Sequence, residues 1–478
     1  MDIFRKSLIY AIVFVFLGPV EIFAFDYVIN DFTIYPTPNI PRPPKGVTFQ
    51  DSLYHTNITR ITDALIDTPG SKWPYLQAGY PKHDIENADA SMLVLQGSGA
   101  PGWHIFNPNP PYNRISGINY YLGSTGQAID FRWDSVDPNK GYYQYRCQFW
   151  KYDVALKKGT PLYDFRQDFV LPENTTMSFV SMQEEGCPSD DCKYWAFRVQ
   201  YHSSTHNPTY WVHALIVFDK DFYGPDQGKV ISVIDETHPD FKPAGFTSMD
   251  RTGNYVWIGD THRFYKRDFS SYVNPGITGH ADLAMSKEGR QVLFGFKNKG
   301  GSNYWAVMWD LESHVTTWLA PIGLPRYHFS GNAYDKPGWG VVCTFKISET
   351  SPFYNDREVI MVELTTRTDP PPRVWRICKD RTLYAGYADG PFAKINRKGT
   401  KIWFGSNWGT PLRDGGQYDV FQVNLPSTWY QDLSAGVFPP ATGSPTPSIP
   451  TTTPTTPTPT TTTAPPSPPK GIKILTSP

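Results

Sequence analysis

The stretch GHADLAMSKEGRQVLFG, residues 279–295, has the pattern of two short strands joined by a polar turn at residues 287–289. In the second strand Val292 and Phe294 fall on one face, because side chains alternate along a strand. The turn contains Gly289, and glycine accepts the positive φ that a tight reversal requires. The stretch therefore predicts a β-hairpin.

The same pattern recurs along the chain. MDRTGNYVWIG (residues 249–259) aligns without a gap with MSKEGRQVLFG (residues 285–295), and INRKGTKIWFG (residues 395–405) matches both. A looser copy, YDKPGWGVVCT, spans residues 334–344. A single hairpin cannot bury its apolar face alone, so the recurrence predicts modules that pack side by side.

The repeated hairpins belong to sheet-like units that follow one another at a spacing of roughly 35–50 residues, which is typical of propeller blades. These units cover about residues 83–106, 130–153, 180–219, 241–269, 280–312, 327–364 and 391–425. No unit has a sustained helical period, so a helical solenoid is disfavoured. We expect an all-β protein with a single β-propeller of seven blades. A β-sandwich is the alternative, but it gives no reason for hairpins to repeat.

The two ends of the chain differ in composition from this central part. Residues 1–24 combine a positive start at Arg5 and Lys6 with a short apolar run and a small residue, Ala24, which predicts a secretory signal peptide and a secreted protein. The run is too short to span a membrane comfortably, so no transmembrane domain is expected after its removal.

Three further segments follow the predicted signal peptide. Residues 25–51 are rich in proline and predict an extended lead-in on the domain surface, and residues 52–436 form the predicted propeller domain. Residues 437–478 contain a Thr/Pro-rich linker and a short tail, which cannot bury a core and is expected to be disordered.

Bulk composition limits the classes of partner. The formal net charge is -1, with Lys+Arg 44 against Asp+Glu 45, so nothing predicts a nucleic-acid partner. Aromatic residues make up 15% of the chain, which suits strands and also sugar-binding surfaces, although most such rings are expected in the core. We expect a monomer.

Cysteine usage fits export without requiring it. Cys187 and Cys192 bracket a polar turn and can close a small disulfide loop. The other three of the 5 cysteines, Cys147, Cys343 and Cys378, leave an odd number, so at least one thiol is expected to be free or to pair elsewhere.

Four phrases carry a resemblance to known proteins: RWDSVDPNKGYYQY (residues 132–145), GHADLAMSKEG (residues 279–289), YHFSGNAYDKPGW (residues 327–339) and KINRKGTKIWFGSNWG (residues 394–409). They resemble secreted microbial β-propellers with TolB-like, WD40-like repeats. In outline the chain is also similar to oligogalacturonate and ulvan lyases, which are seven-bladed propellers. This resemblance implies a propeller over about residues 51–425, a polysaccharide lyase-like activity and one divalent metal ion held by histidines.

Three histidines fall near the starts of predicted first strands, which line the central channel of a propeller: His83, His280 and His328. Counted back from the turn glycines, His280 and His328 differ by one position, so neighbouring blades can bring them together. Asp282 shares a face with His280. His280, Asp282 and His328 form the predicted metal site. A hydrogen-bonded structural network is the alternative interpretation.

A lyase that acts on a uronate must neutralise the carboxylate, remove the α-proton and protonate the leaving oxygen. The sequence Arg326-Tyr327-His328 offers the required residue types, and with His280 these are the candidate catalytic residues. Strand alternation places Arg326 and His328 on one face and Tyr327 on the other. In most proteins such a triplet only completes a strand.

Further ligand-binding candidates lie at corresponding positions in other units. Arg132 and Trp133 stand where the second unit begins, His83 lies in the first, and Trp408 ends a strand where its ring can stack on a sugar or cap the blade.

No serine-hydrolase elbow, nucleotide-binding loop or EF-hand loop occurs. We therefore expect a propeller that binds a glycan or cell-envelope component at its channel mouth. A lyase-like enzyme and a protein–protein interaction scaffold are the alternatives.

Overall fold

The computed structural model describes residues 25–435 except residues 72–73, 98–101, 119–129, 172–173, 204–209, 244, 260, 278–279, 324–326 and 345–351. The predicted signal peptide and the predicted Thr/Pro-rich tail lie outside the described residues.

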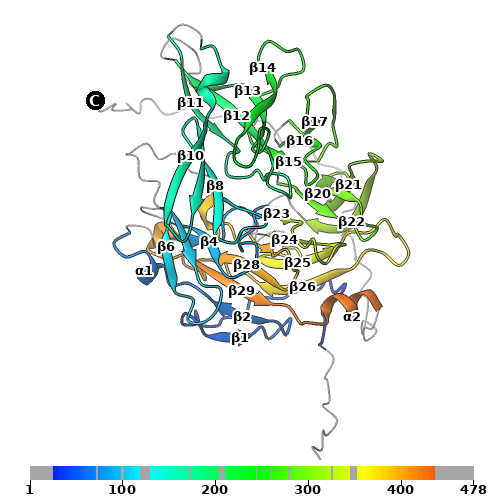
Figure 1. The fold of residues 1–478 in the computed structure, drawn as a ribbon. Coiled ribbons are helices and arrows are strands. Elements are labelled where there is room, and N and C mark those ends of the chain that lie inside the picture. The colour runs from blue at the N-terminus through cyan, green and yellow to red at the C-terminus, as the bar shows by residue number, and fades with distance from the viewer. Residues whose placement is uncertain are drawn as a thin grey trace, which may run out of the picture. The chain divides into compact units, whose positions relative to one another are not determined.

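The described residues form seven antiparallel sheets arranged as blades around one axis, so the predicted seven-bladed propeller is confirmed (Figure 1). Blade one contains β3 (Leu76–Gln77), β4 (Leu93–Gly97), β5 (Trp103–Phe106) and β6 (Arg114–Gly117). Blade two contains β7 (Arg132–Trp133), β8 (Lys140–Tyr145), β9 (Gln148–Asp153) and β10 (Lys158–Asp164). Blade three contains β11 (Thr176–Ser181), β12 (Tyr194–His202), β13 (Tyr210–Asp219) and β14 (Lys229–Asp235). Blade four contains β15 (Thr247–Met249), β16 (Tyr255–Ile258), β17 (Arg263–Lys266) and β18 (Tyr272–Val273).

The remaining blades complete the circle. Blade five contains β19 (Asp282–Met285), β20 (Gln291–Asn298), β21 (Tyr304–Asp310) and β22 (Thr316–Gly323). Blade six contains β23 (Tyr327–Ser330), β24 (Trp339–Thr344), β25 (Glu358–Glu363) and β26 (Val374–Lys379). Blade seven contains β27 (Lys394–Ile395), β28 (Lys401–Ser406) and β29 (Asp419–Asn424) from the C-terminal part, together with β2 (Asn57–Arg60) and β1 (Thr48–Gln50) from the N-terminal part.

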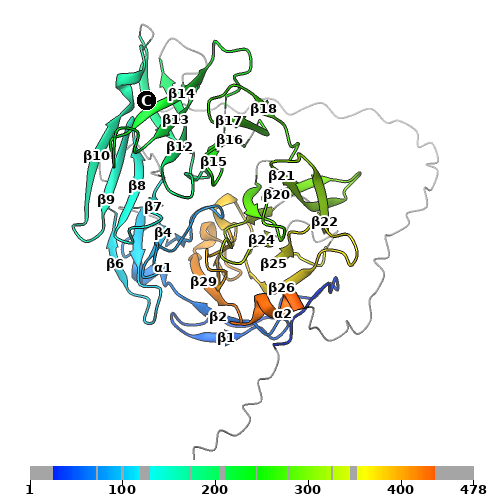
Figure 2. The same ribbon diagram turned by 45° about the vertical axis from the view of Figure 1, so that its right-hand side comes forward.

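Blade seven closes the ring, because it joins two distant parts of the chain. β2 pairs antiparallel with β29 in the register Asn57↔Asn424 and Arg60↔Phe421. Figure 2 shows the blue N-terminal strands beside the orange C-terminal ones. Closure leaves no gap between the first and last blades, which removes an otherwise exposed edge.

The repeated hairpins have the predicted geometry. Gly253, Gly289, Gly338 and Gly399 all adopt positive φ, at 72°, 76°, 91° and 58°. Each of these glycines therefore makes the reversal between the first two strands of its blade. The copy in blade six differs, because β23 ends at Ser330 and an irregular connection precedes Gly338.

Seven buried clusters hold the ring together, and each lies between two neighbouring blades. Both faces of an inner hairpin are therefore buried. Val292 and Phe294 pack toward blade six, whereas Leu293 packs toward blade four. A two-sheet sandwich has one core between its sheets, so this arrangement excludes that alternative.

The N-terminal lead-in lies against blade six. Ile29 forms a bridge with Trp375, and the Arg376 guanidinium donates to the carbonyl oxygens of Asp31 and Thr33. Arg376 also forms a buried ion pair with Glu358, at 2.6 Å.

Helical structure in the described residues is short. It comprises α1 (Ala64–Asp67), α2 (Trp429–Ala435) and three single turns of 3-10 helix at Phe165–Asp168, Tyr387–Asp389 and Leu412–Asp414. None of the described helices has the length and apolarity needed to cross a bilayer.

Candidate functional site

The first strand of each blade lines the central channel. The channel therefore has two ends, and these differ in chemistry. At the start end the first strands begin, and at the turn end they run into the first hairpin turns. Side chains from blades that are not neighbours can touch only across the axis, so such contacts identify the channel interior.

A segment of blade one, residues 78–84, crosses this interior; we call it the channel segment. The Lys394 ammonium of blade seven donates to the carbonyl oxygens of Ala78 and Tyr80, each at 2.5 Å. Asn332 of blade six donates to the Pro81 carbonyl at 3.2 Å. These side chains donate hydrogen bonds to backbone carbonyl groups that no neighbouring strand pairs with.

A cluster of rings occupies the start end of the channel. The hydroxyl of Tyr80 and Nδ1 of His280 share a hydrogen bond of 2.6 Å. The rings of His280 and His328 lie edge to face at 5.1 Å, and His328 stacks on Phe392 at 4.4 Å. Blades one, five, six and seven thus meet here, as expected for the two histidines.

Burial keeps two of the channel histidines, His83 and His328, neutral. It lowers the pKa of His328 well below the ordinary value, and the neighbouring His280 and Lys82 act in the same direction. Burial also lowers the pKa of His83, with a second contribution from Arg132. Nε2 of His83 lies 2.5 Å from the Arg132 guanidinium, so the neutral imidazole accepts this hydrogen bond.

The predicted metal site of His280, Asp282 and His328 is not assembled. Asp282 accepts hydrogen bonds from the backbone N–H of Leu283 at 2.8 Å and of Gly331 at 2.7 Å. The described residues contain no group of three or more His, Cys, Asp or Glu placed to hold a metal ion. The two imidazoles supply suitable donors, but the carboxylate is committed to the backbone.

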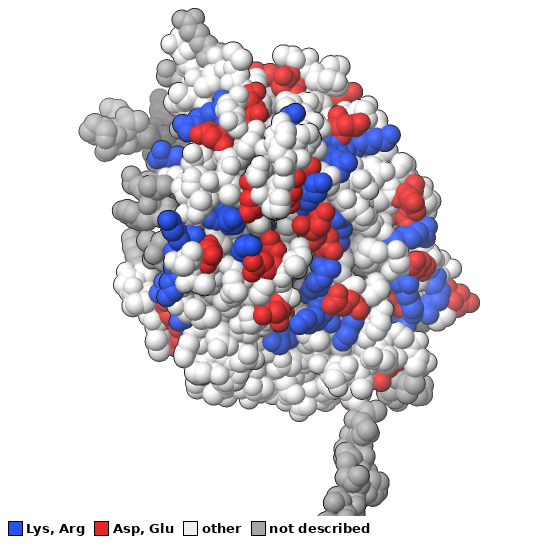
Figure 3. Space-filling model, viewed as in Figure 1, with Lys and Arg blue, Asp and Glu red and all other residues white. Residues whose placement is uncertain are grey.

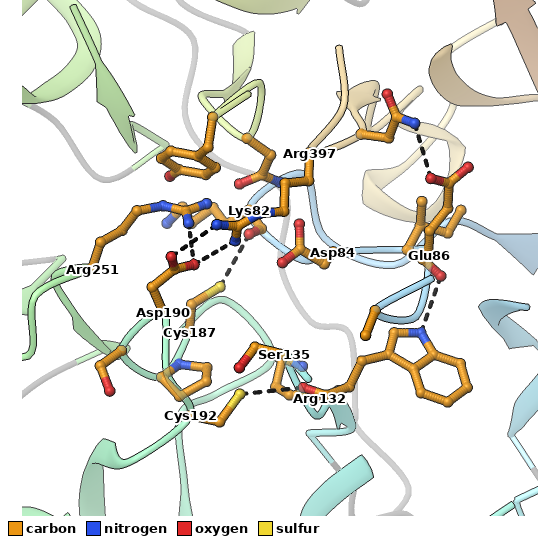
Figure 4. A pocket seen from close by; sticks show the side chains of 18 of the residues that line it. Lys82, Asp84, Glu86, Arg132, Ser135, Cys187, Asp190, Cys192, Arg251 and Arg397 are labelled. Atoms are coloured by element: carbon orange, nitrogen blue, oxygen red, sulfur yellow. Dashed lines mark hydrogen bonds and ion pairs between the residues drawn. The ribbon is translucent and has the colours of Figure 1, made fainter. Parts of the chain in front are cut away.

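The turn end contains a cavity of about 230 Å³ (Figure 4). Every blade contributes a charged side chain to its lining. In blade order these include Asp84, Arg132, Asp190, Arg251, Asp282, Asp335 and Arg397. Apolar side chains, among them Trp133 and Leu283, complete the wall.

An ion-pair clamp spans this cavity. Asp190 of blade three pairs with Arg397 of blade seven at 2.5 Å and also with Arg251 of blade four. The Arg251 guanidinium lies over the ring of Tyr334. Figure 4 shows Asp190 between the two arginines. The clamp joins blades on opposite sides of the channel.

Two further cations are held inside the protein. Arg132 donates to the carbonyl oxygens of Gly186, at 2.5 Å, and Phe131, at 2.7 Å, in addition to His83. The Lys82 ammonium pairs with Glu185 at 3.0 Å and lies 3.6 Å from the centre of the Phe246 ring. Burial lowers the pKa of Lys82 and lowers that of Lys394 to about 7.

The remaining predicted residues lie elsewhere or have structural partners. Tyr327 is buried between blades five and six and its hydroxyl donates to the Ile322 carbonyl, so it does not share the channel face of His328. Trp408 stacks on Phe421 at 4.8 Å and donates to the Ile40 carbonyl, which places it against the N-terminal lead-in.

The last two candidate residues are Trp133 and Arg326. Trp133 lines the cavity edge and donates to the Ile85 carbonyl at 3.2 Å. Arg326 lies outside the described residues.

The expected Cys187–Cys192 disulfide does not form, since all five cysteines are free thiols. The Cys187 thiol donates to the Lys82 carbonyl at 3.0 Å and the Cys192 thiol to the Trp133 carbonyl at 3.4 Å. The polar loop between the two cysteines carries Asp190, whose side chain reaches across the channel to Arg397. The two thiols therefore contact different blades, Cys187 blade one and Cys192 blade two.

Sequence reasoning missed most of the cavity. Tyr80, Lys82 and Asp84 adjoin the predicted His83, but no repeat pattern marks them. Arg251 and Arg397 had a usable signal, because each stands two residues before the turn glycine of its hairpin. Lysines stand at the same position in the copies at residues 285–295 and 334–344.

Comparison with solved structures supports the fold. An oligogalacturonate lyase in complex with manganese is similar at a TM-score of 0.55 and 13% identity, over 85% of this chain and 99% of that one. Oligogalacturonate lyase from Vibrio parahaemolyticus is similar at 0.54 and 12%, over 84% and 100%. TolB from Acinetobacter baumannii matches at only 0.29 and 11%, over 65% and 66%. At these identities the likeness to the two lyases shows the propeller fold alone. No protein-family model and no curated protein matches the sequence.

Proposed function

We propose that this protein is an extracellular propeller that binds a glycan in the cavity at the turn end of its channel. The observation that supports this function is a cavity of about 230 Å³ to which all seven blades contribute charged side chains. Pockets for drug-sized ligands measure about 300–1,000 Å³, so this cavity suits one sugar unit at the end of a chain. The charged and polar groups of its lining can exchange hydrogen bonds with the hydroxyl groups of a sugar.

The surface chemistry agrees with a glycan rather than a polyanion as partner. On the face shown in Figure 3, basic and acidic side chains are interspersed without a large area of one sign. This distribution matches the formal net charge of -1. We propose export because the composition of residues 1–24 predicts a signal peptide. The ligand class is accordingly a glycan or another component of a cell envelope.

A pair of tryptophan substitutions tests where the glycan binds. Ser135 is exposed and lines the cavity, whereas the adjacent Val136 is 82% exposed and does not line it. Ser135→Trp should abolish binding in a glycan array and in titration calorimetry, because the indole fills the cavity. Val136→Trp should bind as the unmodified protein does. If both variants bound glycan equally, the proposed site would be rejected. If the unmodified protein bound no glycan or polysaccharide at all, the proposal would be rejected in favour of a protein partner.

A lyase-like activity is the second candidate, and the ring cluster at the start end favours it. Tyr80 and His280 share a short hydrogen bond beside the neutral His328. A tyrosine–histidine pair can take an α-proton and return a proton to a leaving oxygen. A divalent ion bound to the imidazoles would neutralise the uronate carboxylate.

Two measurements test the second candidate. Incubation with uronate polysaccharides should produce the ultraviolet absorbance of unsaturated products, and His280→Ala should remove it. Elemental analysis should find one divalent ion per chain that is lost in the same variant. A broad substrate panel without product, in protein that still binds glycan, would leave the first function alone.

A further inference from the structure

The chemistry of the cavity selects among glycans, and this inference rests on the proposed binding function. We infer that the cavity binds a neutral sugar through paired hydroxyl groups, and that the Asp84 carboxylate is the residue that accepts their hydrogen bonds. Acidic sugars and amino sugars are both disfavoured.

Four of the five cationic side chains that line the cavity are committed to partners within the protein, and the fifth, Lys398, is exposed on its wall. Arg251 and Arg397 share Asp190, and Arg132 donates to backbone carbonyls and to His83. Lys82 is held by Glu185. A carboxylate ligand would have to displace one of these partners before it gained one of these four cations, and the displaced group would remain nearby. Among the lining residues, Lys398 is accessible to a uronate without such a displacement, but a carboxylate at the centre of the cavity would face the unpartnered carboxylate of Asp84.

The carboxylates of the wall are engaged in the same way, with one exception. Asp282 accepts backbone N–H groups, Glu86 accepts from Asn396 at 2.9 Å, and Asp134 accepts from the backbone of Val136 at 2.8 Å. Among the described residues, Asp84 has neither a hydrogen-bond donor nor an ion-pair partner. Its side chain is exposed to the cavity, and Figure 4 shows it near the centre.

The surroundings of Asp84 favour neutral donors over a cationic ligand. Protein surrounds the carboxylate, and this desolvation raises its pKa, while Arg251 and Arg397 lower it in part. An ammonium group placed on Asp84 would face both of these guanidinium groups. Two hydroxyl groups on adjacent sugar carbons can donate to the two carboxylate oxygens without that repulsion.

The test uses the full chain and three sets of oligosaccharides: neutral hexose oligomers, oligogalacturonate and chitosan oligomers. Neutral oligomers should bind best. Asp84→Asn preserves size but removes the charge, so it should weaken neutral-sugar binding about 10-fold or more. Binding should also weaken as pH falls through the raised pKa of Asp84, because the protonated carboxyl is a poorer acceptor.

Asp89→Asn is the matched control. Asp89 lies five positions along the chain in an exposed turn, accepts from the backbone of Ser91 at 2.9 Å and does not line the cavity. This variant should bind as the unmodified protein does. Circular dichroism should confirm that both variants keep the native spectrum.

The outcomes separate this inference from the proposed function. Preference for oligogalacturonate or chitosan oligomers, with binding still blocked in Ser135→Trp, would overturn the inference and keep the cavity as a glycan site. Unchanged neutral-sugar binding in Asp84→Asn would have the same meaning. No binding of any of the three sets would reject both.

Discussion

The two ends of the channel contain side chains of different chemistry. At the start end, Tyr80, His280, His328 and Phe392 fill the axis with rings in contact at 4.4 to 6.4 Å. At the turn end, charged side chains from all blades surround a cavity. Burial among the rings keeps His328 neutral, whereas the charged groups of the turn end need either partners or solvent. The turn end therefore has a cavity for a ligand, while the start end has titratable rings suited to proton transfer.

Arg132 connects the two ends, so its removal should have the largest effect. The guanidinium satisfies the carbonyls of Gly186 and Phe131 and the imidazole of His83, all inside the protein. Arg132→Met should lower the free energy of unfolding by about 4 kcal/mol, since several buried acceptors lose their donor. Urea denaturation measures this change.

The control for Arg132 is Arg413→Met. The Arg413 side chain is 69% exposed and its ion pair with Asp414 is long, at 3.9 Å. Its loss should change the free energy of unfolding by less than about 0.5 kcal/mol. If Arg132→Met behaved like this control, the two ends would not be joined through Arg132.

Asp282 should make stability depend on pH. Desolvation raises its pKa to about 6 from an ordinary 3.8. The folded protein then binds more protons than the unfolded chain between these values, so the Asp282 contribution to stability is lost as pH rises. From about pH 4 to 7, the wild-type protein should lose about 3 kcal/mol relative to Asp282→Asn.

Urea denaturation at several pH values measures this difference. Asp89 gives a control of opposite sign, because the hydrogen bond from Ser91 lowers its pKa and favours the folded state as pH rises. Its effect should be smaller, since the side chain is exposed. A pH-independent difference between wild type and Asp282→Asn would show that this carboxyl is open to solvent at the turn end.

Tyr80→Phe should have a moderate effect at the start end. The substitution keeps the ring contacts with His328 and Phe392 and removes only the hydroxyl that bonds His280. The free energy of unfolding should fall by about 1 kcal/mol, the usual net value of one hydrogen bond. Tyr163→Phe, whose hydroxyl bonds Asp168 near the surface, is the control and should change less. If the protein is a lyase, Tyr80→Phe should lose far more activity than a loss of about 1 kcal/mol in the free energy of unfolding can explain.

Arg397→Gln should have the smallest effect on stability, although it breaks the clamp across the cavity. The side chains of Arg397 and Asp190 are 43% and 38% exposed, and exposed pairs contribute less than about 1 kcal/mol. The difference from wild type should shrink further at high salt. A loss as large as that of Arg132→Met would show that the turn end is as tightly packed as the start end.

Much of the fold could be predicted because the hairpin signal is local. Gly253, Gly289, Gly338 and Gly399 make the reversals that the repeats indicated. The proximity of His280 and His328 also followed from counting positions in neighbouring blades. The predicted metal triad failed because sequence spacing places Asp282 on a face without showing that its oxygens bond the backbone of Gly331 and Leu283.

The sequence by itself determined the seven hairpin-based blades, since turn glycines and alternating apolar residues act within a few positions. Only the tertiary structure decided which side chains meet in the channel. The contact of Tyr80 with His280 and that of Asp190 with Arg397 each join residues about two hundred positions apart. Such contacts depend on ring closure and on the path of residues 78–84 across the axis, and no local pattern encodes either.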